Sequence, residues 1–75
     1  MSQTAPTDAD ELEAMQQYLH WLTPKQRADF MACDVRGLTH AQQANDRDVQ
    51  PPVVTQSVVS ARRRLRSIAE EKGDL

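Results

Sequence analysis

The stretch GLTHAQQANDRDVQPPVVTQSVVSARRRLR (residues 37–66) contains the clearest helix signals of the chain. Gly37 and then Thr39 are typical of one helix ending and another beginning, because glycine adopts the left-handed conformation and a threonine side chain caps a helix. The run Gln50-Pro51-Pro52 ends that second helix and suits the start of a third. Apolar residues then recur at the spacing of an amphipathic helix, namely Val54, Val58, Ala61, Leu65 and Ile68. We therefore expect helices over Thr39–Arg47 and Pro52–Glu71.

Two more helices are expected before this stretch. Leu12, Met15, Leu19 and Leu22 form one apolar stripe behind Thr7, which suits an N-cap, and this predicts a helix over Asp8–Leu22. Thr23-Pro24 predicts the start of another, over Pro24–Val35. The expected fold is a small all-α domain of three to four helices over residues 7–72, with flexible tails at 1–6 and 73–75. Neither a wing nor a sheet is expected.

The composition argues against an enzyme. A chain of 75 residues with 39% apolar residues leaves no room for a pocket of roughly 300–1,000 Å³. His20 and His40 have no partner at metal-ligand spacing, and the single Cys33 excludes a disulfide within the chain. We expect no catalytic residue, no cofactor and no metal. The absence of a signal peptide or an apolar run long enough for a membrane span predicts a cytoplasmic protein that has no membrane partner.

Charge is distributed unevenly. Residues 1–22 carry four acids and no lysine or arginine, whereas residues 23–75 carry nine bases and seven acids, so the net charge of −2 is the sum of −4 and +2. Four arginines lie within five residues, at Arg62, Arg63, Arg64 and Arg66. Such a patch can bind phosphate on a protein that is acidic as a whole.

A short helix, a short turn and a second helix with exposed polar side chains form the helix-turn-helix pattern, whose second helix enters the major groove of DNA. Gln56 can contact adenine with two hydrogen bonds, and the arginines beyond it can neutralise phosphates. The alternative is the solvated face of an amphipathic helix. The residues that we assign to a DNA interface are Thr39, His40, Val53, Thr55, Gln56, Ser57, Ser60, Arg63 and Arg64.

Residues 22–66 resemble region four of bacterial sigma factors, especially the extracytoplasmic-function type. The segment LTPKQR (22–27) is similar to the family's entry to its second helix, and DVRGLTHAQQA (34–44) is similar to its turn-and-helix segment. VVTQSVVSARRRLR (53–66) is similar to its recognition helix. The resemblance implies a helical DNA-binding domain that acts in transcription.

Four positions depart from that pattern. Asp29, Gln43 and Arg47 stand where the family has aliphatic residues, and Asp48 stands where its turn has glycine. We expect Asp48 to adopt the left-handed conformation, because Asp tolerates it better than most residues. Gln43 and Arg47 are expected to bury their stems and leave their polar ends in water, with Trp21 supplying part of the missing apolar cover.

The sequence thus predicts a sequence-specific, double-stranded-DNA-binding transcription regulator that is not a complete sigma factor. A homodimer is expected, because Leu12, Trp21, Leu65 and Ile68 need cover, and RNA polymerase or another regulator is a further expected partner. Two alternatives stay open. One is a protein-interaction module that keeps the helix-turn-helix frame without binding DNA, and the other is a DNA-packaging domain like those of phage small terminases.

Overall fold

A computed structural model of the protein describes residues 9–75, and every regular element in that range is helical. The predicted cap at Thr7 and the predicted tail at 1–6 lie outside the described residues. The α-helices are α1 (Ala9–Gln16), α2 (Pro24–Phe30), α3 (His40–Arg47) and α4 (Pro51–Glu71). A 3₁₀ turn, η1 (Leu19–Trp21), precedes α2, and a π-helical turn, η2 (Met31–Val35), continues it. The prediction of a small all-α domain is confirmed.

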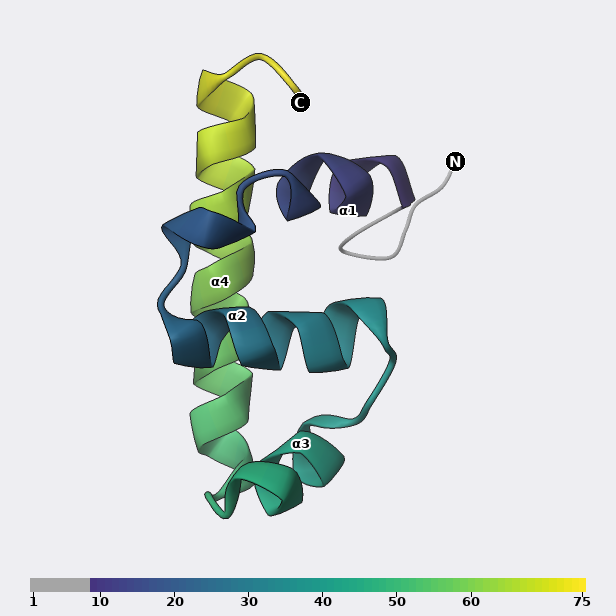
Figure 1. The fold of residues 1–75 in the computed structure, drawn as a ribbon, viewed down its shortest axis with the longest axis vertical. Helices are drawn as coiled ribbons and strands as arrows, with labels where there is room; N and C mark the ends of the chain where they lie inside the picture. The colour runs from purple at the N-terminus through teal and green to yellow at the C-terminus, as the bar shows by residue number, and fades with distance from the viewer. Residues whose placement is uncertain (1–8) are drawn as a thin grey trace.

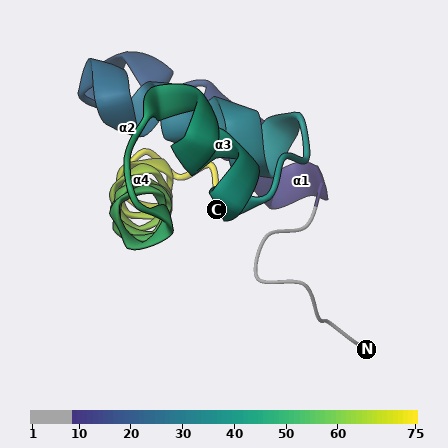
Figure 2. The same ribbon diagram turned by 90° about the horizontal axis from the view of Figure 1, so that it is seen from below.

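The long helix α4 organises the molecule. In Figure 1, α2 crosses α4 near its middle and continues as η2 away from it, α3 lies beside the N-terminal end of α4, and α1 lies beside its C-terminal half. Figure 2, which views α4 nearly end-on, shows the other helices gathered on one side of it. The opposite side of α4 is therefore uncovered along its length. Within residues 9–75 no helix, α4 included, combines the length and the apolar character that crossing a bilayer requires.

The predicted helix boundaries in the middle of the chain are confirmed. The side chain of Thr23 caps the N-terminus of α2, and the side chain of Thr39 caps the N-terminus of α3. Each threonine forms a full capping box with the glutamine three residues later. In the second box the Thr39 side chain accepts from the Gln42 amide at 3.0 Å, and the Gln42 side chain accepts from the Thr39 amide at 2.8 Å. Gly37 lies in the left-handed region with φ of 84°. These local hydrogen bonds fix where α2 with η2 ends and α3 begins.

The first predicted helix is wrong in its second half. The chain leaves α1 after Gln16, passes through Tyr18 at φ −116° and ψ 21°, and then forms η1. The break allows Met15 and Leu22 to enter the same apolar cluster, although they lie on either side of it. The apolar spacing of the segment fits both a straight helix and this broken one, so the pattern alone did not separate them.

The core has two parts, each built on α4. The larger cluster consists of Met15, Leu22, Phe30, Ala61 and Leu65. The smaller consists of Ala44, Val54 and Val58, with Cys33 and Val49 packed against it. Trp21 does not supply the predicted cover, because 51% of its surface is exposed.

Asp29, Gln43 and Arg47 form one hydrogen-bonded group between α2 and α3. Asp29 is fully buried, accepts from Gln43 Nε2 at 3.0 Å with Oδ1, and pairs with Arg47 through Oδ2. The prediction that the polar ends of Gln43 and Arg47 reach into water is therefore wrong. Each end is held by the carboxylate, because a buried charge must be paired and hydrogen-bonded. Below, this group is called the polar triad.

Candidate nucleic-acid interface

The helices α3 and α4 are joined by a tight turn over residues 48–50. Asp48 has φ of 58° and ψ of 47°, which confirms the predicted left-handed conformation. Its amide donates to the carbonyls of Ala44 and Asn45, and the Val49 amide donates to Ala44 at 2.9 Å. Val49 also packs against the smaller core cluster. The turn therefore sets α3 firmly against the N-terminal part of α4.

The uncovered side of α4 carries four of the predicted interface residues. Val53, Gln56, Ser60 and Arg63 follow each other at steps of three, four and three, so they lie on one side of the helix, and all four are exposed. Gln56, Ser60 and Arg63 make no side-chain hydrogen bond to residues 9–75. Their donors and acceptors are thus available to a ligand. We call this row the outer face of α4.

Thr39, His40 and Thr55 have internal partners. The Thr39 hydroxyl is used by the capping box, as described above. His40 Nδ1 lies 2.8 Å from Thr55 Oγ1, and the Thr55 hydroxyl also lies 3.2 Å from the carbonyl of Pro51, to which it donates. These contacts join α3 to α4 and position the outer face, and they already use the proton of the Thr55 hydroxyl.

Ser57 lies on a covered side of α4. Its Oγ is buried and has no hydrogen-bond partner among the residues that the structure describes. The structure therefore does not bring Ser57 together with Gln56 and Ser60, its neighbours in the predicted site.

The four clustered arginines separate into two kinds. Arg62 forms a fork with Asp34, in which Nε and one terminal nitrogen each lie 2.5 Å from a carboxylate oxygen, and this hydrogen-bonded pairing raises the pKa of Arg62. Arg66 pairs with Glu11 at 3.0 Å. Arg62 and Arg66 are thus held in ion pairs within the fold. Arg63 and Arg64 remain exposed and form the part of the basic patch that a ligand can reach.

Sequence reasoning missed the acids that pair with Arg62 and Arg66. The paired residues are separated by 28 and 55 positions, so no local spacing signals the contact. The signal for Asp29 was present, because a lone carboxylate at an apolar position between two helices needs a donor. Gln43 and Arg47 also occupy expected apolar positions and carry N–H donors, so they could have been predicted to pair with Asp29.

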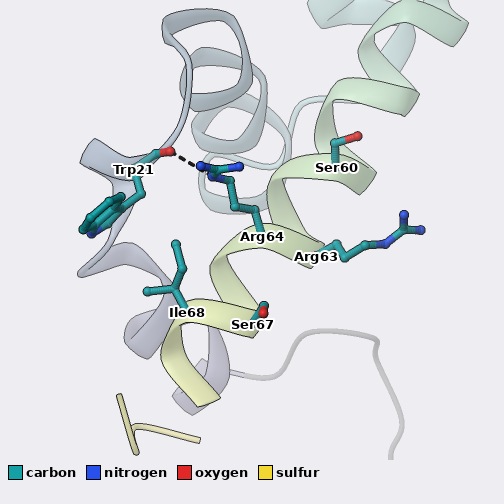
Figure 3. A pocket seen from close by; sticks show the side chains of 6 residues that line it. All are labelled: Trp21, Ser60, Arg63, Arg64, Ser67 and Ile68. Atoms are coloured by element: carbon teal, nitrogen blue, oxygen red, sulfur yellow. Dashed lines mark hydrogen bonds between the residues drawn. The ribbon is translucent and has the colours of Figure 1, made fainter. Parts of the chain in front are cut away.

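An open groove lies beside the outer face, between η1 and the C-terminal half of α4. Its volume is about 510 Å³, but it is an open groove on the surface and not the enclosed pocket that the composition argues against. The lining residues are Trp21, Ser60, Arg63, Arg64, Ser67 and Ile68. Figure 3 shows Ile68 on α4 pointing towards Trp21 on η1, with Arg64 also reaching towards Trp21 and Arg63 directed away from it. Arg64 Nε donates to the Trp21 carbonyl at 3.1 Å.

Neither a metal centre nor a reactive thiol is evident within residues 9–75. Histidine, cysteine and carboxylate side chains form no group of three that could hold an ion there. Cys33 is half-buried, and desolvation, with the nearby charges of Asp29 and Asp34, raises the pKa of its thiol. The raised pKa disfavours the thiolate, which is the nucleophilic form of cysteine.

Comparisons of the chain with protein-family models, with curated proteins and with solved structures find no match.

Proposed function

We propose that the protein binds double-stranded DNA through the outer face of α4 and acts as a regulator of transcription. The observation that carries the proposal is the row of exposed, internally unpartnered side chains at Gln56, Ser60 and Arg63 on the second helix of a tight helix-turn-helix. An amide, a hydroxyl and a guanidinium are groups that recognise base edges and phosphates.

Gln56 and Arg63 are expected to contact different parts of the DNA, because they lie at different positions along α4. Gln56 lies in the N-terminal part of the helix, close to the α3 turn, where a recognition helix approaches the bases. Arg63 is seven residues further on, about 10 Å along the helix axis, where contact with a backbone phosphate is expected. Gln56 is accordingly assigned to sequence recognition and Arg63 to affinity.

The test is a titration of the full chain with duplex DNA at several salt concentrations. Log K is expected to fall linearly with log salt, and Arg63→Ala should reduce the magnitude of that slope by about one on every sequence. Lys72→Ala removes the same charge near the C-terminal end of α4, away from the outer face, and should leave the slope unchanged. Equal slopes for wild type and Arg63→Ala would remove Arg63 from the interface.

Sequence recognition needs a second measurement. A cognate duplex selected from a random pool should lose about 1–3 kcal/mol of binding free energy with Gln56→Ala, whereas random duplex should lose little. If wild-type protein shows no salt-dependent association with any duplex, the DNA-binding proposal fails.

A protein-interaction module remains the second candidate, and one observation favours it. Val53 and Val59 on α4 are 45% and 40% exposed, and Asp46 and Asp48 add exposed negative charge beside the start of that helix. Apolar and acidic groups in this position attract a protein surface more than they attract phosphate. In that case Gln56→Ala would leave DNA retention unchanged and would weaken binding to the partner instead.

A further inference from the structure

We propose that the groove between Trp21 and the C-terminal half of α4 binds an acidic amphipathic helix of a partner protein. The groove combines two apolar side chains, Trp21 on η1 and Ile68 on α4, with two exposed arginines, of which Arg64 reaches across it. Tryptophan and arginine are the residue types that most often dominate the binding energy of protein interfaces. This inference goes beyond the proposed DNA binding and does not depend on it.

The geometry of the groove fits a helix rather than a small molecule. The groove is open and runs along α4 from Ser60 to Ile68, about 12 Å at the rise of an α-helix. A small-molecule site buries most of its ligand inside an enclosed pocket, which this groove does not provide. An amphipathic helix instead requires a shallow apolar side with polar groups along the rim.

The charge of the groove selects an acidic occupant. Its described lining contains Arg63 and Arg64 but no carboxylate. The bond from Arg64 Nε to the Trp21 carbonyl holds that side chain across the groove, while its terminal nitrogens make no hydrogen bond to residues 9–75. A carboxylate can accept from these terminal N–H groups in a charge-assisted pair without first reordering the arginine.

Two other occupants fit less well. A second copy seated groove to groove would bring the Arg64 side chains of both copies together, and like charges across an interface are unfavourable. A DNA phosphate would be attracted by the arginines but would gain nothing from the exposed indole of Trp21 or from Ile68. Ile68 also lies twelve residues beyond Gln56, roughly 18 Å along α4, outside the part of the helix that we assign to base recognition.

Trp21 is the only tryptophan of the chain, so its fluorescence reports directly on the groove. The probe is a synthetic helical peptide of about 18 residues, roughly 27 Å long, with a leucine stripe and glutamates elsewhere. Its matched control carries lysine at each glutamate position. The glutamate peptide is expected to shift Trp21 emission to shorter wavelength in a saturable, salt-sensitive manner, and the lysine peptide is expected to leave the emission unchanged.

Variants then locate the binding. With a dye-labelled glutamate peptide followed by anisotropy, Trp21→Gln and Arg64→Ala should each weaken binding by at least about fivefold. Arg36→Ala is the control, because it also removes one positive charge. Arg36 follows η2 and lies about 18 Å along the helix from Pro24, where α2 begins beside Trp21, so this variant should bind the peptide like wild type. Gln56→Ala should also leave peptide binding intact, so failure of DNA recognition and failure of the groove proposal are distinguishable.

Three results would overturn the proposal. The first is the same emission with and without the glutamate peptide. The second is an equal response to the lysine peptide. The third is a shift caused instead by raising the protein concentration or by adding duplex DNA, which would assign the groove to a second copy or to nucleic acid.

Discussion

At the scale of single residues, Asp29 carries a carboxylate with no exposed surface, held by donors from two side chains of α3. Taking one charged partner away leaves the other without compensation, which is strongly destabilising, whereas replacing the whole group by apolar residues is often neutral or stabilising. Replacing one residue of the polar triad should therefore destabilise the fold, whereas replacing all three together should not.

The first prediction follows from this asymmetry. Asp29→Leu alone should lower the free energy of unfolding by about 3–5 kcal/mol, since Arg47 and Gln43 lose their acceptor. The triple variant Asp29→Leu, Gln43→Leu, Arg47→Leu should recover that loss or exceed wild type by about 1–4 kcal/mol. Urea unfolding followed by circular dichroism measures both. Asp46→Leu, at an exposed carboxylate of α3, is the control and should change stability by less than about 0.5 kcal/mol. A triple variant no more stable than the single one would show that the triad adds net stability.

The second prediction concerns Ser57, whose buried hydroxyl has no partner among the described residues. Ser57→Ala removes that hydroxyl and places a better helix former inside α4. We expect a gain of about 1 kcal/mol or more in the free energy of unfolding, because an unsatisfied buried polar group costs about 1–3 kcal/mol. Thermal unfolding gives the result, with Ser60→Ala on the outer face as the matched control. A loss of stability would mean that the hydroxyl has a partner after all.

At the scale of the elements, the α3 turn depends on one residue in an unfavourable conformation. Asp48 occupies the left-handed region, where a Cβ atom is strained and glycine is not. Asp48→Gly should therefore raise stability by up to about 1 kcal/mol, and Asp48→Val should lower it by at least as much. Asp48→Asn retains tolerance of this conformation without the charge, so it separates backbone strain from electrostatics. Equal stability of the glycine and valine variants would contradict the argument.

The elements also show which features can be predicted from sequence. The ends of α2 with η2 and of α3 were found because Thr23, Thr39 and Gly37 act on neighbouring residues. The break near Tyr18 was not found, since the apolar spacing of Leu19 and Leu22 fits either geometry. For the candidate site, the helical period placed Gln56, Ser60 and Arg63 correctly on the exposed side of α4, but Ser57, which was assigned to the same site, lies on a covered side. The period could not find contacts between distant segments, so Thr55 was assigned to a ligand although it bonds His40.

At the scale of the whole molecule, side-chain contacts join the beginning of the described chain to its end. The Tyr18 hydroxyl donates to Asp74, and Arg66 on α4 pairs with Glu11 on α1. The hydrogen bond to Asp74 raises the pKa of Tyr18 above its ordinary value of 10.0, because the neutral hydroxyl is the donor. Because the pKa of Tyr18 is higher in the folded protein than in the unfolded chain, the Tyr18–Asp74 bond adds to the free energy of unfolding at any pH below the unfolded-state pKa. This contribution is lost as the pH rises through the folded-state pKa.

The corresponding prediction is spectroscopic. Tyr18 is the only tyrosine, so tyrosinate absorbance during an alkaline titration belongs to it alone. The midpoint should lie above 10.0 in the folded protein and return towards that value in Asp74→Ala or in denaturant. Glu70→Ala, at another exposed acid near the C-terminal end of α4, is the control and should leave the midpoint in place. A midpoint at 10.0 in wild type would exclude the Tyr18–Asp74 bond in solution.

The homodimer stays a prediction, although fewer of the apolar residues on which it was based still need cover. Leu65 is fully buried within one chain, and Trp21 and Ile68 line the groove that we assign to a partner helix, so a dimer would have to use another surface. Light scattering over a range of concentrations should give twice the 8.5 kDa of one chain if the dimer forms. A constant mass of 8.5 kDa would contradict it.

The central position of α4 has a consequence for the order in which the protein can fold during synthesis. The main packing contacts of α1, α2 and α3 are with α4, which follows all three in the chain. As the chain leaves the ribosome, the first three helices have no partner to bury their apolar sides against, and short isolated helices are marginal in water. We therefore expect these three helices to acquire stable packing only after α4 has been synthesised.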